Sequence, residues 1–283
     1  MTKTISSCEL RKRLRGETPP LLLDVRRASD RVNGPPGISG ADWRDPARLE
    51  HWVESVPEGS EVALYCVRGG SVSQGVQAAL EARGVTARYV EGGLEAWLAD
   101  EALWNHPDVG LLRGQGMEEG AVAHAVRVAS IGLWLAGRLD PAKAGPIDLE
   151  LVRRGGLLHD LGKVRDVTNL HGVAGAALGR SLGVPEPVLG CIEKHVRHGP
   201  PALEARDYGL PGRDFRFTRV EERIVSYADK LSDVLAAGLA GSAGEAHERL
   251  PEILRERPGL AKDEATEARY LASRELFASW MLA

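Results

Sequence analysis

The stretch VALYCVRGGSVSQ, residues 62–74, decides the fold of the first hundred residues. It begins with six residues that have the length and apolar character of a buried β-strand, and it leads into a helical pattern from Ser73 to Arg83. Gly84 ends that pattern as a C-terminal helix cap does. Apolar runs at 21–25 and 87–90 lie on either side. Strand, helix and strand in this order, with nearly continuous apolar strands, predict an α/β domain with a parallel sheet and flanking helices.

The pattern changes after residue 103. Residues 104–118 contain Pro107 and several glycines, and we predict a linker there. Apolar residues then recur at helical spacing, which predicts an all-α helical bundle over residues 119–283. The expected helices cover 121–139, 149–158, 173–182, 187–195, 219–237 and 264–280, and a long irregular loop is expected at 200–217. The segment after Ala240 carries no recognisable chemistry, and we expect its helices to cap the bundle.

Composition restricts the class of protein. The chain has 283 residues, a net charge of −4 and three cysteines, Cys8, Cys66 and Cys191, so we expect reduced thiols and no disulfide framework. The charge gives no argument for binding a nucleic-acid duplex or a membrane. The first thirty residues lack a secretory core, and no uncharged stretch reaches the roughly 18 residues of a membrane span. We therefore expect a cytoplasmic protein, and its oligomeric state stays open.

Cys66 stands where the predicted strand meets the loop. Backbone N–H groups of a tight loop over Arg68, Gly69, Gly70 and Ser71, together with the start of the following helix, form a nest that binds an anion. The same field favours a thiolate, so Cys66 is a candidate nucleophile that accepts a sulfur atom or a phosphoryl group. The alternative is a buried cysteine that only packs.

Three motifs in the first hundred residues, in fitting order, resemble a rhodanese domain. LLLDVR at 21–26 is similar to the first strand of that family, and YVEGGLEAW at 89–97 is similar to its closing signature. Residues 34–41 occupy the place of a segment that normally contains a histidine, which is absent here. The resemblance covers roughly residues 5–100 and implies a sulfurtransferase domain that carries sulfur on Cys66.

The loop after Cys66 departs from the commonest rhodanese pattern. Ser71 stands where a second arginine is usual, and a subgroup that shares Val67, Val72, Ser73 and Gln74 looks closer. The missing arginine removes a contact for thiosulfate, so the sulfur donor stays open. A sensing or regulatory module that keeps the fold without turnover is the alternative.

Histidines and aspartates recur on the apolar helices of the second half. His159 and Asp160 are adjacent in GLLHDLGK, His124 lies upstream on a buried helix, and Asp229 lies downstream on another. Each alone is more commonly a hydrogen-bonded core residue or a helix cap. Together they indicate a divalent metal, because buried carboxylates cost several kcal/mol each unless a cation or partner balances them.

This arrangement resembles the HD superfamily of metal-dependent phosphohydrolases over roughly residues 119–240. The resemblance implies that His124, His159, Asp160 and Asp229 bind metal, and that His171 and His195 add the ligands of a second ion, with Asp160 bridging both. His198 is an alternative to His195. A mixed imidazole and carboxylate set suits one or two ions of Fe, Mn, Co, Ni or Zn.

Two cations near these motifs are candidate substrate contacts. Lys163 follows the His-Asp pair and is placed to meet a phosphate oxygen, as in related HD proteins, so we group it with Asp160 as catalytic. Arg127 lies about one turn after His124 and can meet phosphate or orient a ligand. A surface ion pair is the alternative for both.

The leading hypothesis is a metal-dependent phosphohydrolase for a nucleotide or other small phosphate ester, fused to a rhodanese-like domain that takes sulfur from a donor. The first alternative makes the rhodanese part a regulatory module. The second alternative makes the HD site a diiron oxygenase.

Overall fold

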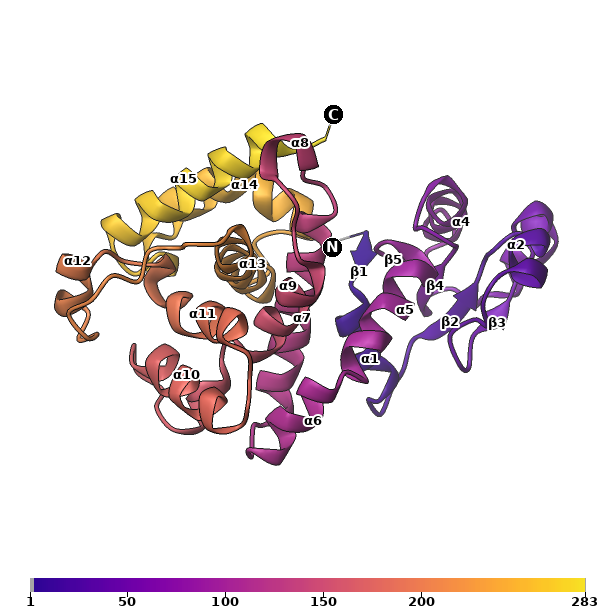
Figure 1. The fold of residues 1–283 in the computed structure, drawn as a ribbon. Coiled ribbons are helices and arrows are strands. Elements are labelled where there is room, and N and C mark those ends of the chain that lie inside the picture. Colours follow the sequence, from indigo (N-terminus) through magenta and orange to yellow (C-terminus); the bar gives the residue numbers. More distant parts are fainter. Residues whose placement is uncertain (1–2, 283) are drawn as a thin grey trace. The chain divides into compact units, whose positions relative to one another are not determined.

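The computed structural model describes residues 3–282, which form two compact units, one up to Ala102 and one from Leu103 onward (Figure 1). The first unit is α/β and the second is helical, as the sequence predicted. Over the described range, none of the helices has the length and apolar character needed to span a membrane.

The described part of the first unit contains one five-stranded sheet, and its paired strands are all parallel. Its order is β1-β5-β4-β2-β3, so β4 lies in the centre. The strands are β1 (Thr4–Ile5), β2 (Leu21–Asp24), β3 (Asp42–Trp43), β4 (Glu61–Tyr65) and β5 (Thr86–Val90). A central parallel strand is buried on both faces, which is why β4 reads as an almost continuous apolar run.

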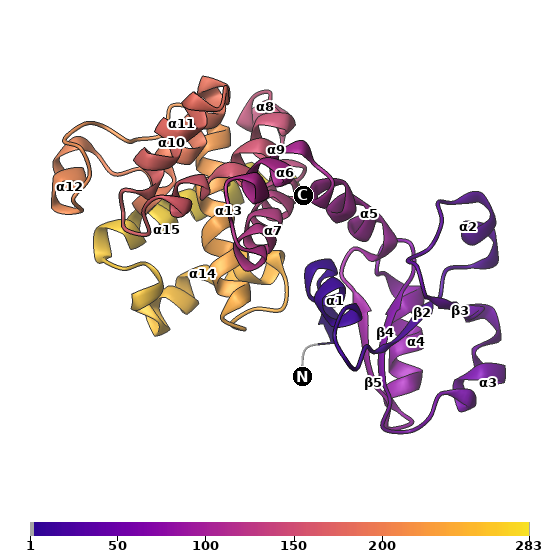
Figure 2. The same cartoon turned by 90° about the horizontal axis from the view of Figure 1, so that it is seen from below.

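Side chains of β4 alternate between two cores. Val62 and Leu64 pack with residues of α3 (Leu49–Trp52) and α4 (Ser71–Glu81). Ala63 and Tyr65 pack with residues of α1 (Ser7–Leu14) and α5 (Gly93–Trp104) on the other face. Helices therefore cover both faces of the sheet (Figure 2). The remaining helices of this unit are α2 (Ala28–Asn33) and the short 3-10 turns η1 (Pro46–Arg48) and η2 (Val53–Ser55).

A buried ion pair explains the Asp and Arg of the 21–26 motif. Arg26, which is 2% exposed, donates to Asp24 Oδ2 at 2.7 Å and to the Pro35 carbonyl at 2.8 Å. The Tyr65 hydroxyl accepts from the Ile38 N–H at 2.9 Å. These bonds fasten the 34–41 loop to β2 and β4, so the motif serves the fold.

The second unit is a helical bundle around α13 (Val220–Ala236), which packs against α7, α9, α11, α14 and α15 (Figure 1). The other elements are α6 (Pro107–Gly114), α7 (Glu119–Ala136), α8 (Pro141–Ala144), α9 (Leu149–Leu158), η3 (Leu161–Val164), α10 (His171–Ser181), α11 (Glu186–Lys194), η4 (Val196–His198), α12 (Ala202–Asp207), α14 (Ala243–Glu256), η5 (Pro258–Leu260) and α15 (Glu264–Trp280).

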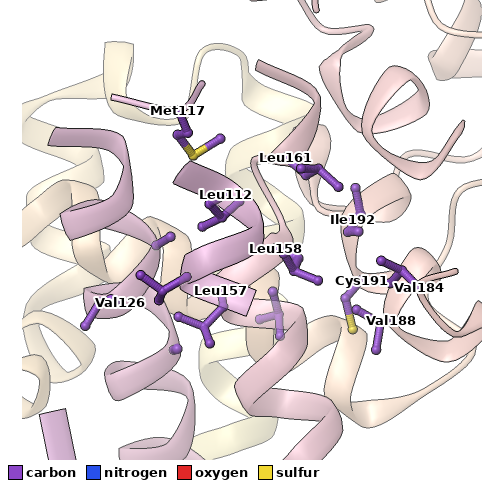
Figure 3. Close-up of a cluster of buried hydrophobic side chains, with 14 of the residues drawn as sticks. Leu112, Met117, Val126, Leu157, Leu158, Leu161, Val184, Val188, Cys191 and Ile192 are labelled. Atoms are coloured by element: carbon purple, nitrogen blue, oxygen red, sulfur yellow. The ribbon is translucent and has the colours of Figure 1, made fainter. Parts of the chain in front are cut away.

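The stretch predicted as a linker, 104–118, is instead structured. Pro107 begins α6, and Val109, Leu112 and Met117 are buried in the core that Figure 3 shows around Leu157 and Leu158. The glycines misled the prediction, because Gly110 and Gly114 lie within a helix whose apolar face is packed. The predicted extents of the two domains, residues up to 103 and residues 119–283, remain a proposal.

Besides α6, other helices of the second unit fall outside the helix ranges predicted from sequence. α8 lies between two expected helices, α12 lies inside the expected loop at 200–217, and α14 lies in the segment after Ala240, where helices were expected without bounds. α14 contains Pro251 in its interior, a residue that normally argues against helix. Packing of its buried apolar residues against α13 overrides that local preference.

Candidate metal centre and cysteine loop

Six histidines and aspartates from five helices meet in the second unit. His124 lies within α7 and Asp229 within α13. His159 caps the C-terminus of α9 and is followed directly by Asp160, while His195 caps α11 and His171 begins α10. Helix ends thus supply four of these six side chains, and η3 and η4 turn the chain immediately after His-Asp and after His195.

The first group of ligand atoms comprises His124, His159, Asp229 and one oxygen of Asp160. His124 Nε2 lies 3.1 Å from Asp229 Oδ1. His159 Nε2 lies 3.3 Å from His124 Nε2 and 3.3 Å from Asp160 Oδ2. This carboxylate and imidazole cluster has the composition of a transition-metal site.

The second group lies on the other oxygen of Asp160. His171 Nε2 and His195 Nε2 each lie 3.5 Å from Asp160 Oδ1, and 3.0 Å from one another. Asp160 therefore directs one oxygen to each group of imidazoles. A carboxylate in this position is able to bridge two ions.

Hydrogen bonds on the far side orient the rings. The Nδ1 atoms of His159 and His195 donate to the carbonyls of Gly156 and Ile192, at 2.8 and 2.7 Å. His171 Nδ1 donates to the Thr168 carbonyl. In the tautomer that carries the proton on Nδ1, each ring presents its Nε2 lone pair to the centre, as metal-ligating histidines do.

The residues fit a bound cation. Ligands about 2.0–2.2 Å from one ion lie about 3.0–3.5 Å from each other, which matches the spacing within both groups. Burial would raise the pKa of Asp160, yet His159 and His195 hold that pKa well below its usual range. Burial would likewise lower the pKa of His159, but Asp160 and Asp229 raise it strongly. The carboxylates of Asp160 and Asp229 therefore stabilise positive charge at this centre.

Glycines allow the helices that carry the ligands to approach closely. A Cβ on Gly156 would lie 2.6 Å from the Cα of Ala129 on α7, and one on Gly162 would lie 1.8 Å from the His171 carbonyl oxygen. Glycine in GGLLHDLGK therefore brings α9 against α7, and η3 against the start of α10. These two glycines therefore help to set the distances between the candidate metal ligands on the neighbouring helices.

A cavity of about 450 Å³ adjoins the ligands. Within the described residues its lining includes four cationic side chains, those of Lys163, Arg197, Lys230 and Lys262, and three carboxylates. Sequence reasoning predicted only Lys163 among these cations. Lys230 and Arg197 are one and two residues from predicted ligands, a signal that was available, whereas nothing near Lys262 in the sequence indicates the cavity.

Three predicted residues have distinct positions. Lys163 Nζ lies 2.6 Å from Asp160 Oδ2 and lines the cavity. Arg127 is not part of the lining; its Nε donates to Ser232 Oγ, which contacts His124 Nδ1 at 3.3 Å, so Arg127 reaches His124 indirectly through the serine. His198 turns away and bonds Ser226 and Ser273, so the geometry favours His195 over His198.

In the first unit, Cys66 directly follows β4 and its loop leads into α4. Its Sγ lies 3.1 Å from Ser73 Oγ. Burial would raise the pKa of the thiol, but the Ser73 hydroxyl and the backbone N–H groups of Ser73, Arg68 and Gly70 lower it overall. Loop donors therefore favour a thiolate.

The side chains of the loop contribute less than its backbone. Arg68 is mostly exposed and pairs with Glu95 at 3.1 Å, so its charge is already partnered. Gly69 has φ +67°, and a Cβ there would lie 2.7 Å from the Val90 carbonyl oxygen, so the loop requires glycine. Gly70 caps α4 and the exposed Ser71 begins it.

Comparison with family models identifies a domain in each half of the chain. The family model described as the HD domain matches residues 122–233, and that of the rhodanese-like domain matches residues 7–100. The chain therefore contains a rhodanese-like domain followed by an HD domain.

Individual relatives cover parts of the chain. An uncharacterized protein of Methanocaldococcus jannaschii is 40% identical over 113 residues, which is 40% of this chain and 66% of that protein. Ribonuclease Y of Thermus thermophilus is 32% identical over 161 residues, 56% of this chain and 23% of that protein. The chain thus spans just under two thirds of the first relative and under a quarter of the second.

Solved structures are similar to each domain in turn. The HD domain of the L. monocytogenes phosphodiesterase PgpH has a TM-score of 0.38 at 20% identity, covering 62% of this chain and 97% of that one. A rhodanese-like domain protein of Staphylococcus aureus has a TM-score of 0.31 at 30% identity, covering 34% and 91%.

Proposed function

We propose that the protein is a metal-dependent phosphohydrolase that cleaves a nucleotide or another phosphate ester in the HD domain. The observation that carries this proposal is the position of Asp160, whose two oxygens face two groups of imidazoles beside a cavity lined by cations. Cationic walls suit an anionic ester. Relatives named ribonuclease Y act on RNA, whose linkages are phosphate esters, which supports the same class of reaction.

The proposed division of labour follows from the contacts. One or two divalent transition ions (Fe, Mn, Co, Ni or Zn), when bound, lower the pKa of a water and polarise a phosphoryl oxygen. His124, His159, Asp160 and Asp229 would hold one ion, and His171 and His195 with Asp160 would hold another. The backbone acceptors behind His159 and His195 prevent these rings from turning.

Lys163 has the role of a phosphate-binding group. Its ammonium lies against Asp160 but 43% of the side chain is exposed, so it is able to reach an oxygen of the ester at the same place. Positioned charge of this kind stabilises the negative charge that develops on phosphoryl oxygens during attack.

Removal of Asp160 tests the hydrolase. We expect Asp160→Ala to lose bound metal and to lower phosphate release from a nucleotide panel and from bis(p-nitrophenyl) phosphate by at least about 100-fold, because both groups share this ligand. Asp214→Asn is the matched control, since Asp214 is exposed and bonds Arg216 outside the cavity. Metal content by elemental analysis accompanies the rates. Full activity in Asp160→Ala would contradict the proposal, and oxygen consumption by iron-loaded protein without hydrolysis would favour the diiron oxygenase.

For the rhodanese-like domain we propose that Cys66 carries sulfur. The Cys66 thiolate attacks the outer sulfur of a persulfide or thiosulfonate donor, a new S–S bond forms on Cys66, the S–S bond of the donor breaks, and the rest of the donor leaves with the electron pair as a thiolate or a sulfinate. The lowered pKa of the thiol supports this role. The pairing of Arg68 with Glu95 favours the alternative, a sensing module, because it leaves the loop without a free side-chain cation.

Mass spectrometry separates these alternatives. After exposure to a sulfane-sulfur donor, we expect the peptide that contains Cys66 to gain the mass of one sulfur atom, and Cys66→Ala protein to gain none. A wild-type chain that stays unmodified would leave the sensing module as the better account.

A further inference from the structure

One wall of the metal cavity comes from the segment after the HD match. Ala261 and Lys262 follow η5, and Thr266 and Tyr270 belong to α15; all four line the cavity. The HD match ends at residue 233, so this wall is contributed by residues outside it. These helices pack on the bundle, as expected, and the segment also supplies one wall of the cavity, which was not predicted.

Lys262 occupies an unusual backbone position in this wall. Its φ is +72°, a left-handed conformation that glycine adopts easily and lysine rarely adopts. Strained backbone of this kind is concentrated at functional sites. The conformation allows Asp263 to cap α15, where its Oδ1 accepts from the Thr266 N–H at 2.7 Å, while Lys262 lines the cavity.

Lys262 also differs from the other cations of the cavity in having no acceptor. The other three are paired as follows: Lys163 with Asp160, Arg197 with Asp263, and Lys230 with Asp233. Within residues 3–282, the structure gives the Lys262 ammonium no hydrogen bond and no ion pair. Partial burial lowers its pKa, the neighbouring charges of Arg197 and Lys230 lower it further, and the carboxylates of Asp229 and Asp233 offset part of this shift. The Lys262 side chain is exposed at the cavity and its ammonium has no direct carboxylate contact in the described part of the chain, so an anion is able to reach it.

We propose that Lys262 is a specificity-determining residue that binds a second phosphate group of the substrate, separate from the phosphoryl group held at the metal centre. This inference rests on the proposed hydrolase function. Lys163 contacts the bridging carboxylate and serves the scissile group, whereas Lys262 enters from a different element and has no ion pair with Asp160 or Asp229. A cavity of about 450 Å³ is of the size that holds a nucleotide-sized ligand. The substrate class is therefore a phosphate ester with at least two phosphate groups.

The test is calorimetric titration of the metal-loaded full chain with three probes. Adenosine 5′-monophosphate carries one phosphate; adenosine 5′-diphosphate and adenosine 3′,5′-bisphosphate carry two, adjacent or separated. Phosphate release is measured in parallel. We expect wild-type protein to bind at least one of the two-phosphate probes about tenfold or more tightly than the monophosphate, as a charge-assisted contact provides.

Three variants isolate the lysine. Lys262→Gly, whose backbone favours a positive φ, should fold at least as well as wild type, lose the preference for two phosphates and keep the affinity for the monophosphate. Lys262→Arg should retain the preference. Lys143→Ala is the control, because Lys143 bonds the Ser279 carbonyl outside the cavity.

Failures of the two proposals are distinguishable. If wild-type protein binds all three probes equally, or if Lys262→Gly keeps the preference, the role of Lys262 is wrong while the hydrolase proposal stands. If wild-type protein binds none of the probes and releases no phosphate, the hydrolase proposal has failed and this inference falls with it.

Discussion

The thiol of Cys66 illustrates how a few donors set the chemistry of one residue. Desolvation opposes ionisation, but the hydroxyl of Ser73 and the N–H groups of the loop outweigh it, so the pKa lies below that of an ordinary thiol. The nest expected from the glycines of the loop thus reaches the sulfur through backbone groups, while Arg68 pairs elsewhere. A positive side chain is not needed for this shift.

Removal of one donor should show this. In Ser73→Ala the thiolate loses a hydrogen bond, so the pKa of Cys66 rises and its alkylation by iodoacetamide requires a higher pH. We expect the midpoint of the pH–rate profile, followed on the Cys66 peptide by mass spectrometry, to move in the alkaline direction. Ser71→Ala is the control, because Ser71 is exposed at the start of α4 and has no bond to the sulfur. An unchanged midpoint in Ser73→Ala would show that backbone donors alone set the pKa.

At the scale of elements, the spacing of α7 and α9 controls the metal centre. His124 lies on α7 and His159 directly follows α9, and at Gly156 the backbone of α9 lies so close to Ala129 of α7 that a Cβ would overlap it. The ligands can meet only if this contact is retained, because side chains of histidine have little reach beyond their helix.

Gly156→Ala should therefore weaken both stability and metal binding. The added methyl overlaps Ala129, and overpacking of this kind costs about 1–3 kcal/mol, or very roughly 2–10 °C in Tm. Metal affinity should fall as the helices separate, which a competitive chelator titration measures. Gly110→Ala is the matched control: Gly110 lies on the exposed face of α6 with nothing within 4 Å, so alanine there should be neutral or stabilising. Equal effects of the two substitutions would contradict this account.

At the scale of the whole molecule, each domain contains its complete candidate site. The residues around Cys66 belong to the unit that ends at Ala102, and the six candidate ligands, from His124 to Asp229, belong to the other. The Cys66 and Asp160 variants therefore also report on coupling. If the two domains act independently, Cys66→Ala protein should hydrolyse the ester at the wild-type rate. Asp160→Ala protein should form the Cys66 persulfide as wild-type protein does. A change in the hydrolysis rate in Cys66→Ala or after persulfide formation would instead support a regulatory rhodanese module.

Much of the fold was predictable because it depends on local patterns. The apolar run at 62–67 and the helical spacing after it correspond to β4 and α4, and the helices at 149–158 and 264–280 match α9 and α15. Errors arose where local composition opposed packing. Glycines in α6 suggested a linker and Pro251 obscured α14, although buried apolar contacts hold both helices in place.

By itself the sequence determined the two domain types, the nucleophile candidate and the set of candidate ligands, because these follow from residue identity, spacing and motif order. The division of the ligands around Asp160 was expected from the family resemblance. Only the tertiary structure decided that His195 joins them while His198 turns away, and that Lys262 lines the cavity. The physical reason is that these relations depend on where helices end and on the dihedral angles of single turn residues. Side chains brought together from positions a hundred residues apart leave no local pattern in the chain.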